Sequence, residues 1–228
     1  MSAMTSFMTM PEMTGMHHSD DIFPRFWGLF VMWAIMMIAM MVPSATRTIM
    51  IYARIVRNNA GIAEISPTYL FIGGYILVWT GFSVIAALLQ IYLEQAALLS
   101  PMMVSSSHLL GASLLILAGI YQLLPIKESC LRHCQSPQGF ISEHYRPGMS
   151  GALRMGFKHG LYCLGCCWAL MLLLFVAGVM NLLWVLLITL FVLLEKLLGL
   201  IWPIATVWST RVSSCGLIIA GLMFYLFK

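Results

Sequence analysis

The stretch that decides the fold is Arg154-Met155-Gly156-Phe157-Lys158-His159-Gly160-Leu161-Tyr162-Cys163-Leu164-Gly165-Cys166-Cys167-Trp168, which passes from a basic segment directly into a long apolar run. Side chains three and four residues apart lie on the same face of an α-helix. His159 comes four residues before Cys163, and Cys166 and Cys167 follow Cys163 at these spacings. We therefore expect one imidazole and up to three thiols to share a helix face at the mouth of a membrane span.

A second group of metal-binding residue types, Cys130-Leu131-Arg132-His133-Cys134, lies upstream of this stretch. In a helix, Cys130 would reach Cys134 at i,i+4 and His133 at i,i+3. All the cysteines of the chain except Cys215 fall in these two clusters, which one polar loop joins. The clusters are therefore the first candidates for a functional site, whereas Cys215 is expected to be a packing residue.

The composition predicts a membrane protein. The chain of 228 residues is 61% hydrophobic and 9% charged, whereas soluble domains carry roughly 25% charged residues. We expect an all-α, polytopic transmembrane bundle whose helices pack against lipid and against one another. The sequence has no basic patch interleaved with aromatic residues, so nucleic-acid binding is not expected. We see neither a Ser/His/Asp arrangement nor a phosphate-binding glycine loop, and we predict no catalytic site.

Stretches long enough to cross a bilayer divide the chain into about six expected spans. These are residues 27–50, 69–93, 103–124, 160–180, 182–201 and 205–227. Residues 1–24 form a tail rich in Met and His, and residues 25–228 form one membrane domain. The polar segment 125–159 is expected to be a loop. No apolar stretch follows a basic start in the tail, so the first span is expected to act as the targeting signal.

The distribution of positive charge predicts the topology. Ten of the 12 Lys and Arg residues lie in the loops after the first, third and fifth spans or at the start of the last span. The positive-inside rule places these loops in the cytoplasm and both termini outside. Both cysteine clusters then face the cytosol, where thiols are kept reduced, so they are expected to bind metal or to do redox work.

Two further groups of soft ligands precede the cysteines. The tail carries Met10, Met13, Met16, His17 and His18, and the first span carries Met32, Met36, Met37, Met40 and Met41. Thioethers suit Cu(I), and imidazoles also accept Cu(II). The tail is either a copper-capturing segment or a disordered segment that is rich in Met, and the row in the first span is either a metal path or a pliable packing surface.

Glu195 is the acidic residue expected to face the interior of the bundle. An ionisable group inside a membrane is a functional candidate by default. The alternative is that Glu195 pairs with Lys158 or Arg154 at the cytoplasmic face.

Several motifs together resemble a bacterial family described as predicted metal-binding integral membrane proteins. They are Trp33-Ala34-Ile35-Met36-Met37-Ile38-Ala39-Met40-Met41-Val42-Pro43-Ser44, Gly119-Ile120-Tyr121-Gln122 with Pro125 and Lys127, the pair Cys130 and Cys134, His159-Gly160-Leu161-Tyr162-Cys163 through Trp168, Gly178-Val179-Met180-Asn181-Leu182-Leu183-Trp184, and Glu195-Lys196. The similarity covers residues 27–200. The resemblance implies metal binding and a helical membrane domain in a bacterial inner membrane, and it implies no reaction.

The graded placement of soft ligands favours a copper-handling protein. The tail would capture copper outside, the Met row would pass it on, and a cytoplasmic site would hold it. The ligands of this site would be Cys130, His133, Cys134, His159, Cys163, Cys166 and Cys167. Zinc is the alternative metal, and membrane subunits or a copper chaperone are the expected partners besides the lipid bilayer. The alternative functions are an accessory subunit of a larger membrane metalloenzyme and a thiol-disulfide protein, and buried cysteines can also be simple packing residues.

Overall fold

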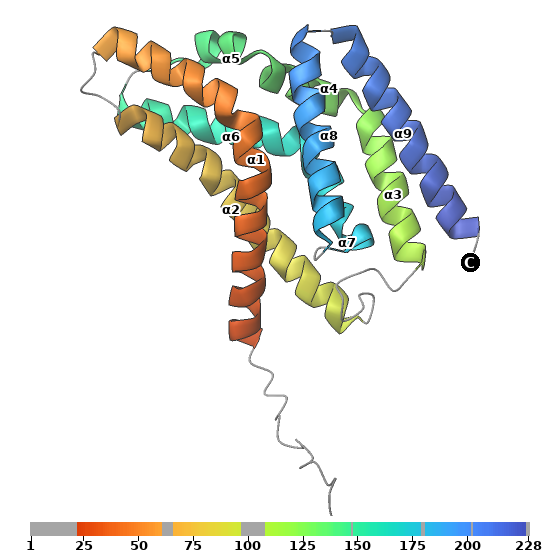
Figure 1. Cartoon of the computed structure of the whole chain (residues 1–228). Helices are drawn as coiled ribbons and strands as arrows, with labels where there is room; N and C mark the ends of the chain where they lie inside the picture. Colours follow the sequence, from red (N-terminus) through yellow and green to blue (C-terminus); the bar gives the residue numbers. More distant parts are fainter. Residues whose placement is uncertain are drawn as a thin grey trace, which may run out of the picture.

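The computed structural model describes residues 22–60, 66–96, 108–146, 148–178, 181–201 and 203–226, and within them every regular element is an α-helix (Figure 1). The helices are α1 (Ile22–Ala60), α2 (Ser66–Gln95), α3 (His108–Leu123), α4 (Pro125–Gln135), α5 (Pro137–His144), α6 (Met149–Leu172), α7 (Leu174–Ala177), α8 (Leu182–Ile201) and α9 (Pro203–Leu226). The all-α prediction is confirmed for this part of the chain. The tail ligands Met10, Met13, Met16, His17 and His18 lie outside the described residues.

Several helices are long and apolar enough to cross a membrane. Within the described ranges these are Ile22–Asn58, Pro67–Gln95, Met149–Val176 and Trp208–Leu226. Helix α3 and helix α4 add a fifth if the pair counts as one span bent by 66°. The expected count of about six spans stays a prediction.

Helix α1 continues through Pro43 instead of stopping near the end of the expected first span. Proline has no backbone N–H and its ring crowds the preceding turn, so a proline inside a helix bends it. Figure 1 shows the bend, which turns the second half of α1 away from the direction of the first half.

The polar segment that was expected to be a loop contains α4, α5 and the first half of α6. Pro125 and Pro137 begin α4 and α5, where the missing N–H of proline costs no helical hydrogen bond. Gly148 has a φ of 88°, a conformation that suits glycine, and α6 starts directly after it. His159 therefore lies well inside a helix and not at the mouth of one.

Helix α6 packs most extensively on α2, and glycines make this contact possible. A Cβ on Gly74 would lie 2.8 Å from the backbone nitrogen of Phe157, and one on Gly156 would meet the carbonyl oxygen of Phe71. A Cβ on Gly160 would lie 2.9 Å from Val78 Cγ2. Small residues four apart let helix backbones approach closely, as they do in membrane helix pairs.

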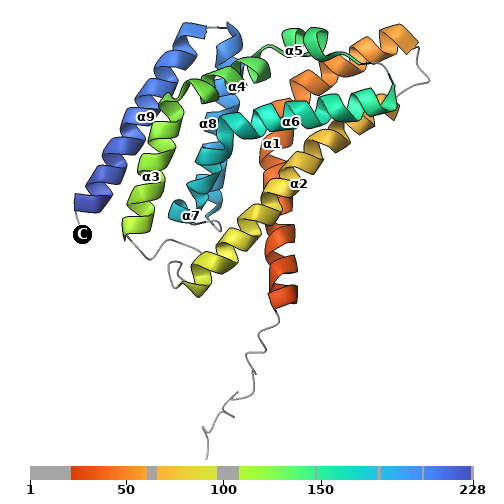
Figure 2. The same cartoon turned by 180° about the vertical axis from the view of Figure 1, so that it is seen from behind.

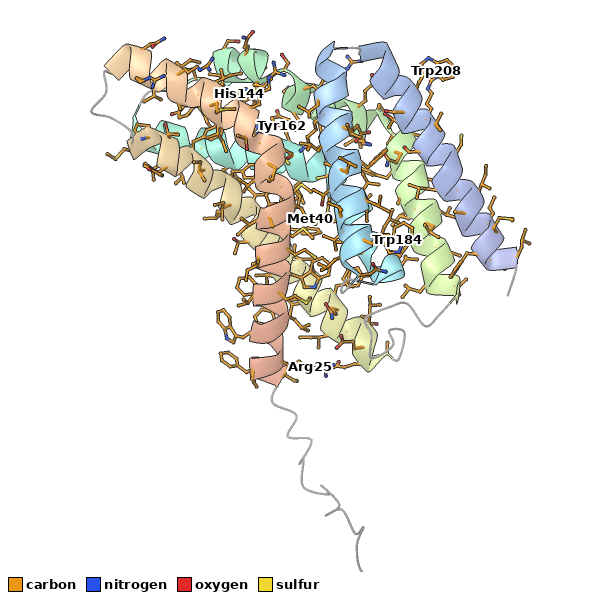
Figure 3. All side chains as sticks on the ribbon, in the orientation of Figure 1. Arg25, Met40, His144, Tyr162, Trp184 and Trp208 are labelled. Atoms are coloured by element: carbon orange, nitrogen blue, oxygen red, sulfur yellow. The ribbon has the colours of Figure 1, made fainter. Side chains whose placement is uncertain are left out.

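The arrangement makes α6 a central helix. It contacts α2, α4, α3, α7 and α8, while α3 packs along α9 (Figure 2). The largest buried cluster includes Trp33 and Met37 of α1, Tyr75 of α2 and Cys163 of α6. Figure 3 shows Met40 on the half of α1 that precedes the bend. The thiols of α6 thus lie where several helices meet.

Candidate metal centre

Cys163 lies at the middle of a buried group of sulfur atoms and polar side chains. Its side chain is 1% exposed. The sulfur is 3.1 Å from the hydroxyl of Tyr75 on α2 and 3.0 Å from the ammonium of Lys196 on α8. Two helices distant in sequence therefore hold polar groups against this one thiol.

The next turn of α6 adds two more buried thiols. Cys166 and Cys167 donate hydrogen bonds to the carbonyl oxygen of Cys163, with sulfur–oxygen distances of 3.1 and 2.8 Å. The sulfur of Cys167 also lies 3.9 Å from the thioether sulfur of Met41 on α1. The last residue of the Met row thus contacts the thiols of α6.

Cys134 of α4 joins this group, and Cys130 of the same helix lies next to it. Cys134 is half-buried, and its thiol lies beside the thiols of Cys163 and Cys166. Cys130 lies against α6 at Gly165, where a Cβ would come within 2.8 Å of the Cys130 sulfur. The structure therefore brings together the two cysteine clusters, which are separate in sequence. We call Cys134, Cys163, Cys166, Cys167 and Met41 the sulfur cluster.

The two expected imidazole ligands take other partners. The ring of His133 stacks on Tyr162 at 4.3 Å between centroids, and its Nδ1 lies 2.8 Å from the carbonyl oxygen of Ser129. His159 is buried between the rings of Phe71, Tyr75 and Phe140. Its Nδ1 has no hydrogen-bond partner among the described residues.

A network of hydrogen bonds joins the helices around the sulfur cluster. Lys196 donates to the hydroxyl of Ser44 at 3.0 Å, and Ser44 donates to the carbonyl oxygen of Met41 at 2.8 Å. The hydroxyl of Tyr75 donates to the same carbonyl at 2.9 Å. The buried ammonium of Lys196 is the positive charge beside Cys163, so it can neutralise a thiolate or a metal–thiolate complex there.

Glu195 does not belong to the sulfur cluster, and its partner is neither Lys158 nor Arg154. It forms an ion pair of 2.5 Å with Lys127 of α4, and the two side chains are 3% and 1% exposed. Lys127 also donates to the side-chain oxygen of Gln122. Because Lys127 is on the helix of Cys134 and Glu195 precedes Lys196, this pair fixes α4 and α8 relative to the thiols of α6.

Sequence patterns pointed to the thiols and Met41 but missed Tyr75, Ser44 and Lys196 as their partners. Lys196 had one signal, a cation beside Glu195 near the end of an apolar run. Ser44 ends the motif that begins at Trp33, whereas nothing local distinguishes Tyr75 from a packing residue.

The sulfur atoms lie near one another, but they do not form a complete set of metal ligands. Among the described residues, no three His, Cys, Asp or Glu side chains have the arrangement of a metal centre. Two sulfurs bound to one ion through bonds of about 2.3 Å are about 3.8 to 4.0 Å apart at tetrahedral or trigonal angles. The separation of 3.9 Å between the sulfurs of Cys167 and Met41 fits this spacing. The thiol of Cys166 donates to the Cys163 carbonyl, and the sulfur of Cys163 lies against Tyr75 and Lys196.

Comparison with known proteins gives one family. Residues 30–224 match the model of the PpoB2 family, whose description is copper chaperone. No curated protein and no solved structure matches the chain.

Proposed function

The chain belongs to the PpoB2 family of copper chaperones, and from this premise we propose that it is an integral membrane protein that binds Cu(I) at the sulfur cluster. Its role would be the capture, transfer or delivery of copper. The observation that carries this proposal is the meeting of α4 and α6 thiols with a thioether of α1 in the buried core.

The kind of ligand supports copper over zinc. Thiolates bind both Cu(I) and Zn(II), whereas a thioether is a soft ligand that suits Cu(I). Met41 is fully buried and its sulfur faces Cys167. The four thiols of the sulfur cluster would also suit a structural zinc site, so the thioether of Met41 is the ligand that favours copper.

The charge of the site supports a monovalent ion. One Cu(I) bound by two thiolates carries one negative charge, and the buried ammonium of Lys196 balances it. A divalent ion with the same ligands would leave a positive charge in the interior, where an unpaired charge is costly. With two thiolate ligands, the ammonium of Lys196 therefore matches the charge of a Cu(I) complex.

The Met row supports a path to the sulfur cluster, which is part of the same proposal. Met37, Met40 and Met41 are buried, and Met32 and Met36 are half-buried, all on the half of α1 that precedes the bend. The row runs along α1 from the end that follows the tail to the thiols of α6. Copper would be captured outside by the tail and would move along this row toward the cytoplasmic side of a bacterial inner membrane.

Metal analysis of the purified full-length protein tests the assignment. We expect wild-type protein loaded with Cu(I) to retain copper, and Cys163→Ser/Cys166→Ser to lose most of it. Cys215→Ser is the matched control, because Cys215 is an exposed thiol on α9, outside the sulfur cluster. Equal copper in all three proteins would contradict the site.

A role as a subunit of a larger assembly would use the exposed surface of α9. In the candidate span Trp208–Leu226 of α9, 11% of the residues are buried. This apolar surface faces lipid or other membrane helices. Native gels of solubilised membranes decide between them, since a species at the mass of the chain alone would exclude a stable complex.

The thiol-disulfide alternative has weaker support. Cys163 and Cys166 have C-x-x-C spacing, but their side chains are 1% and 2% exposed, and thiol exchange requires access to the sulfur. A mixed disulfide trapped at Cys163 would support the thiol-disulfide function.

A further inference from the structure

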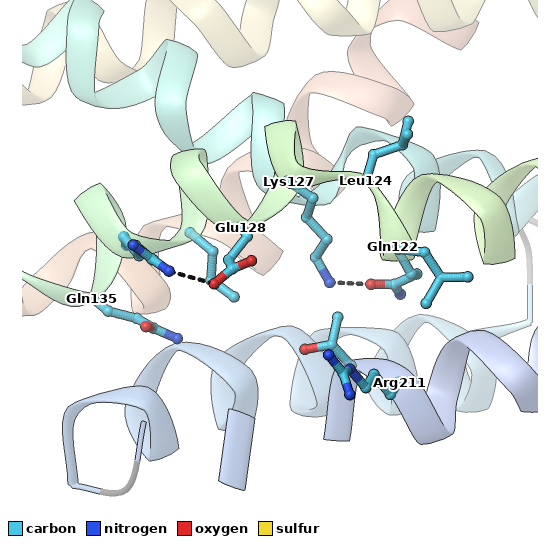
Figure 4. A pocket seen from close by; sticks show the side chains of 10 residues that line it. Gln122, Leu124, Lys127, Glu128, Gln135 and Arg211 are labelled. Carbon is cyan, nitrogen blue, oxygen red and sulfur yellow. Dashed lines mark hydrogen bonds and ion pairs between the residues drawn. The ribbon is translucent and has the colours of Figure 1, made fainter. Parts of the chain in front are cut away.

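A second polar site lies outside the sulfur cluster. A cavity of about 400 Å³ opens where α3 turns into α4, with α9 on its other side (Figure 4). Gln122 lines it from α3, Lys127 and Arg132 from α4, and Arg211 from α9. Figure 4 shows Arg211 across the cavity from Gln122 and Lys127. Neither the thiols nor the Met row takes part in it.

The wall of this cavity holds a hydrogen-bond donor without an acceptor. Gln122 is 5% exposed, and its side-chain oxygen accepts a hydrogen bond from Lys127. Its amide nitrogen has no partner among the described residues. Buried polar groups in proteins are nearly always paired. An unpaired donor in the wall of a cavity is a place where an acceptor can bind, either water or a ligand.

The charges around the cavity leave one positive charge in excess. Glu195 neutralises Lys127, and Glu128 neutralises Arg132 at 2.5 Å. Arg211 is exposed and has no acidic partner among the residues that the structure describes. The ligand expected from an unpaired guanidinium and an unpaired amide N–H is an anion.

We propose that this cavity binds a phosphate group, with the guanidinium of Arg211 and the amide of Gln122 as donors. Guanidinium binds phosphate through two parallel hydrogen bonds, and the amide supplies a third donor from the opposite wall. The charge distribution of the chain predicts that this end of the bundle is cytoplasmic. Basic pockets between membrane helices at that face bind lipid headgroups. The phosphate belongs either to an anionic lipid or to a free ion.

Ligand titrations of the detergent-purified full-length protein test the proposal, with thermal unfolding as the readout. The ligands are short-chain phosphatidylglycerol, short-chain phosphatidylcholine and inorganic phosphate. The test variant is Arg211→Gln, which removes an exposed charge and keeps a polar side chain. The matched control is Lys158→Gln, which removes a cation from a different cavity beside Arg146 and Arg154.

If the phosphate comes from a lipid, phosphatidylglycerol raises the unfolding temperature saturably and phosphatidylcholine does not. If it is a free ion, inorganic phosphate has this effect. In either case Arg211→Gln weakens the affinity by about tenfold or more, as expected for loss of a hydrogen bond from a charged donor. Lys158→Gln binds like the wild type. The proposal is overturned if no ligand stabilises the protein, if Arg211→Gln binds as well as the wild type, or if both variants lose affinity equally.

Discussion

Replacement of Lys127 by Met is expected to destabilise the protein strongly, because it leaves the carboxylate of Glu195 without its cation. The two side chains are 1% and 3% exposed, so little water reaches the group that remains. Loss of one partner of a buried ion pair costs about 3 to 5 kcal/mol. For a chain of this size each kcal/mol lowers the melting temperature by about 2 to 4 °C, so we expect a decrease of about 10 °C.

The control for this prediction lies on the same helix. Arg132 pairs with Glu128 at 2.5 Å, but these side chains are 74% and 51% exposed. Replacement of Arg132 by Met is expected to cost less than about 1 kcal/mol, because exposed ion pairs contribute little. Thermal unfolding of detergent-purified protein, followed by tryptophan fluorescence, measures both variants.

A double variant separates the uncompensated charge from lost packing. Lys127→Met combined with Glu195→Gln removes both charges, and the amide of Gln can still accept the hydrogen bond that Thr210 donates to Glu195. We expect the double variant to recover most of the stability, since neutral replacement of a buried pair is often tolerated. If Lys127→Met melts within about 2 °C of Arg132→Met, or if the double variant is as unstable as the single one, the reasoning is refuted.

The remaining predictions concern the sulfur cluster and the contact between α2 and α6. Met41→Leu keeps the volume of a buried side chain, so stability should change by less than about 1.5 kcal/mol. The affinity of this variant for Cu(I), measured by competition with a chelator, should nevertheless fall by at least about tenfold. An unchanged affinity for Cu(I) would show that Met41 is not a ligand. Gly74→Ala should cost about 1 to 3 kcal/mol because its Cβ meets the backbone of α6. Gly73→Ala should instead stabilise by about 0.5 to 1 kcal/mol, since a Cβ there meets nothing within 4 Å. Alkylation followed by mass spectrometry should modify exposed Cys215 before Cys163, which is 1% exposed, and the reverse order would contradict the described burial.

Helix periodicity predicted the part of the site that depends on local spacing. Cys163, Cys166 and Cys167 lie on one face of α6 over successive turns, and the thiols of Cys166 and Cys167 reach back to the carbonyl of Cys163. His159 also has the spacing that places it on the face of Cys163, but its ring packs among aromatic side chains of α2 and α5. Residues four apart share a face, yet the neighbouring helices decide which groups their side chains contact.

Partners from distant helices could not be predicted, because they depend on tertiary packing. Tyr75 and Lys196 reach Cys163 across 88 and 33 residues of chain. The helices of the polar segment 125–159 were missed for a related reason. Polarity and the prolines suggested a loop, whereas the prolines begin short helices there. The first half of α6 is also helical, and its glycines let it pack directly on α2, a contact that local sequence does not reveal.

The unequal burial of the thiols gives the cluster an outer and an inner side. Cys134 is half-buried and touches both Cys163 and Cys166, which are 1% and 2% exposed. An ion that enters on the side of α4 would bind Cys134 first. The ion could then bind an inner sulfur before its bond to Cys134 breaks. Such a handover, one sulfur at a time, keeps the ion bound throughout, so no hydrated intermediate has to form inside the helices.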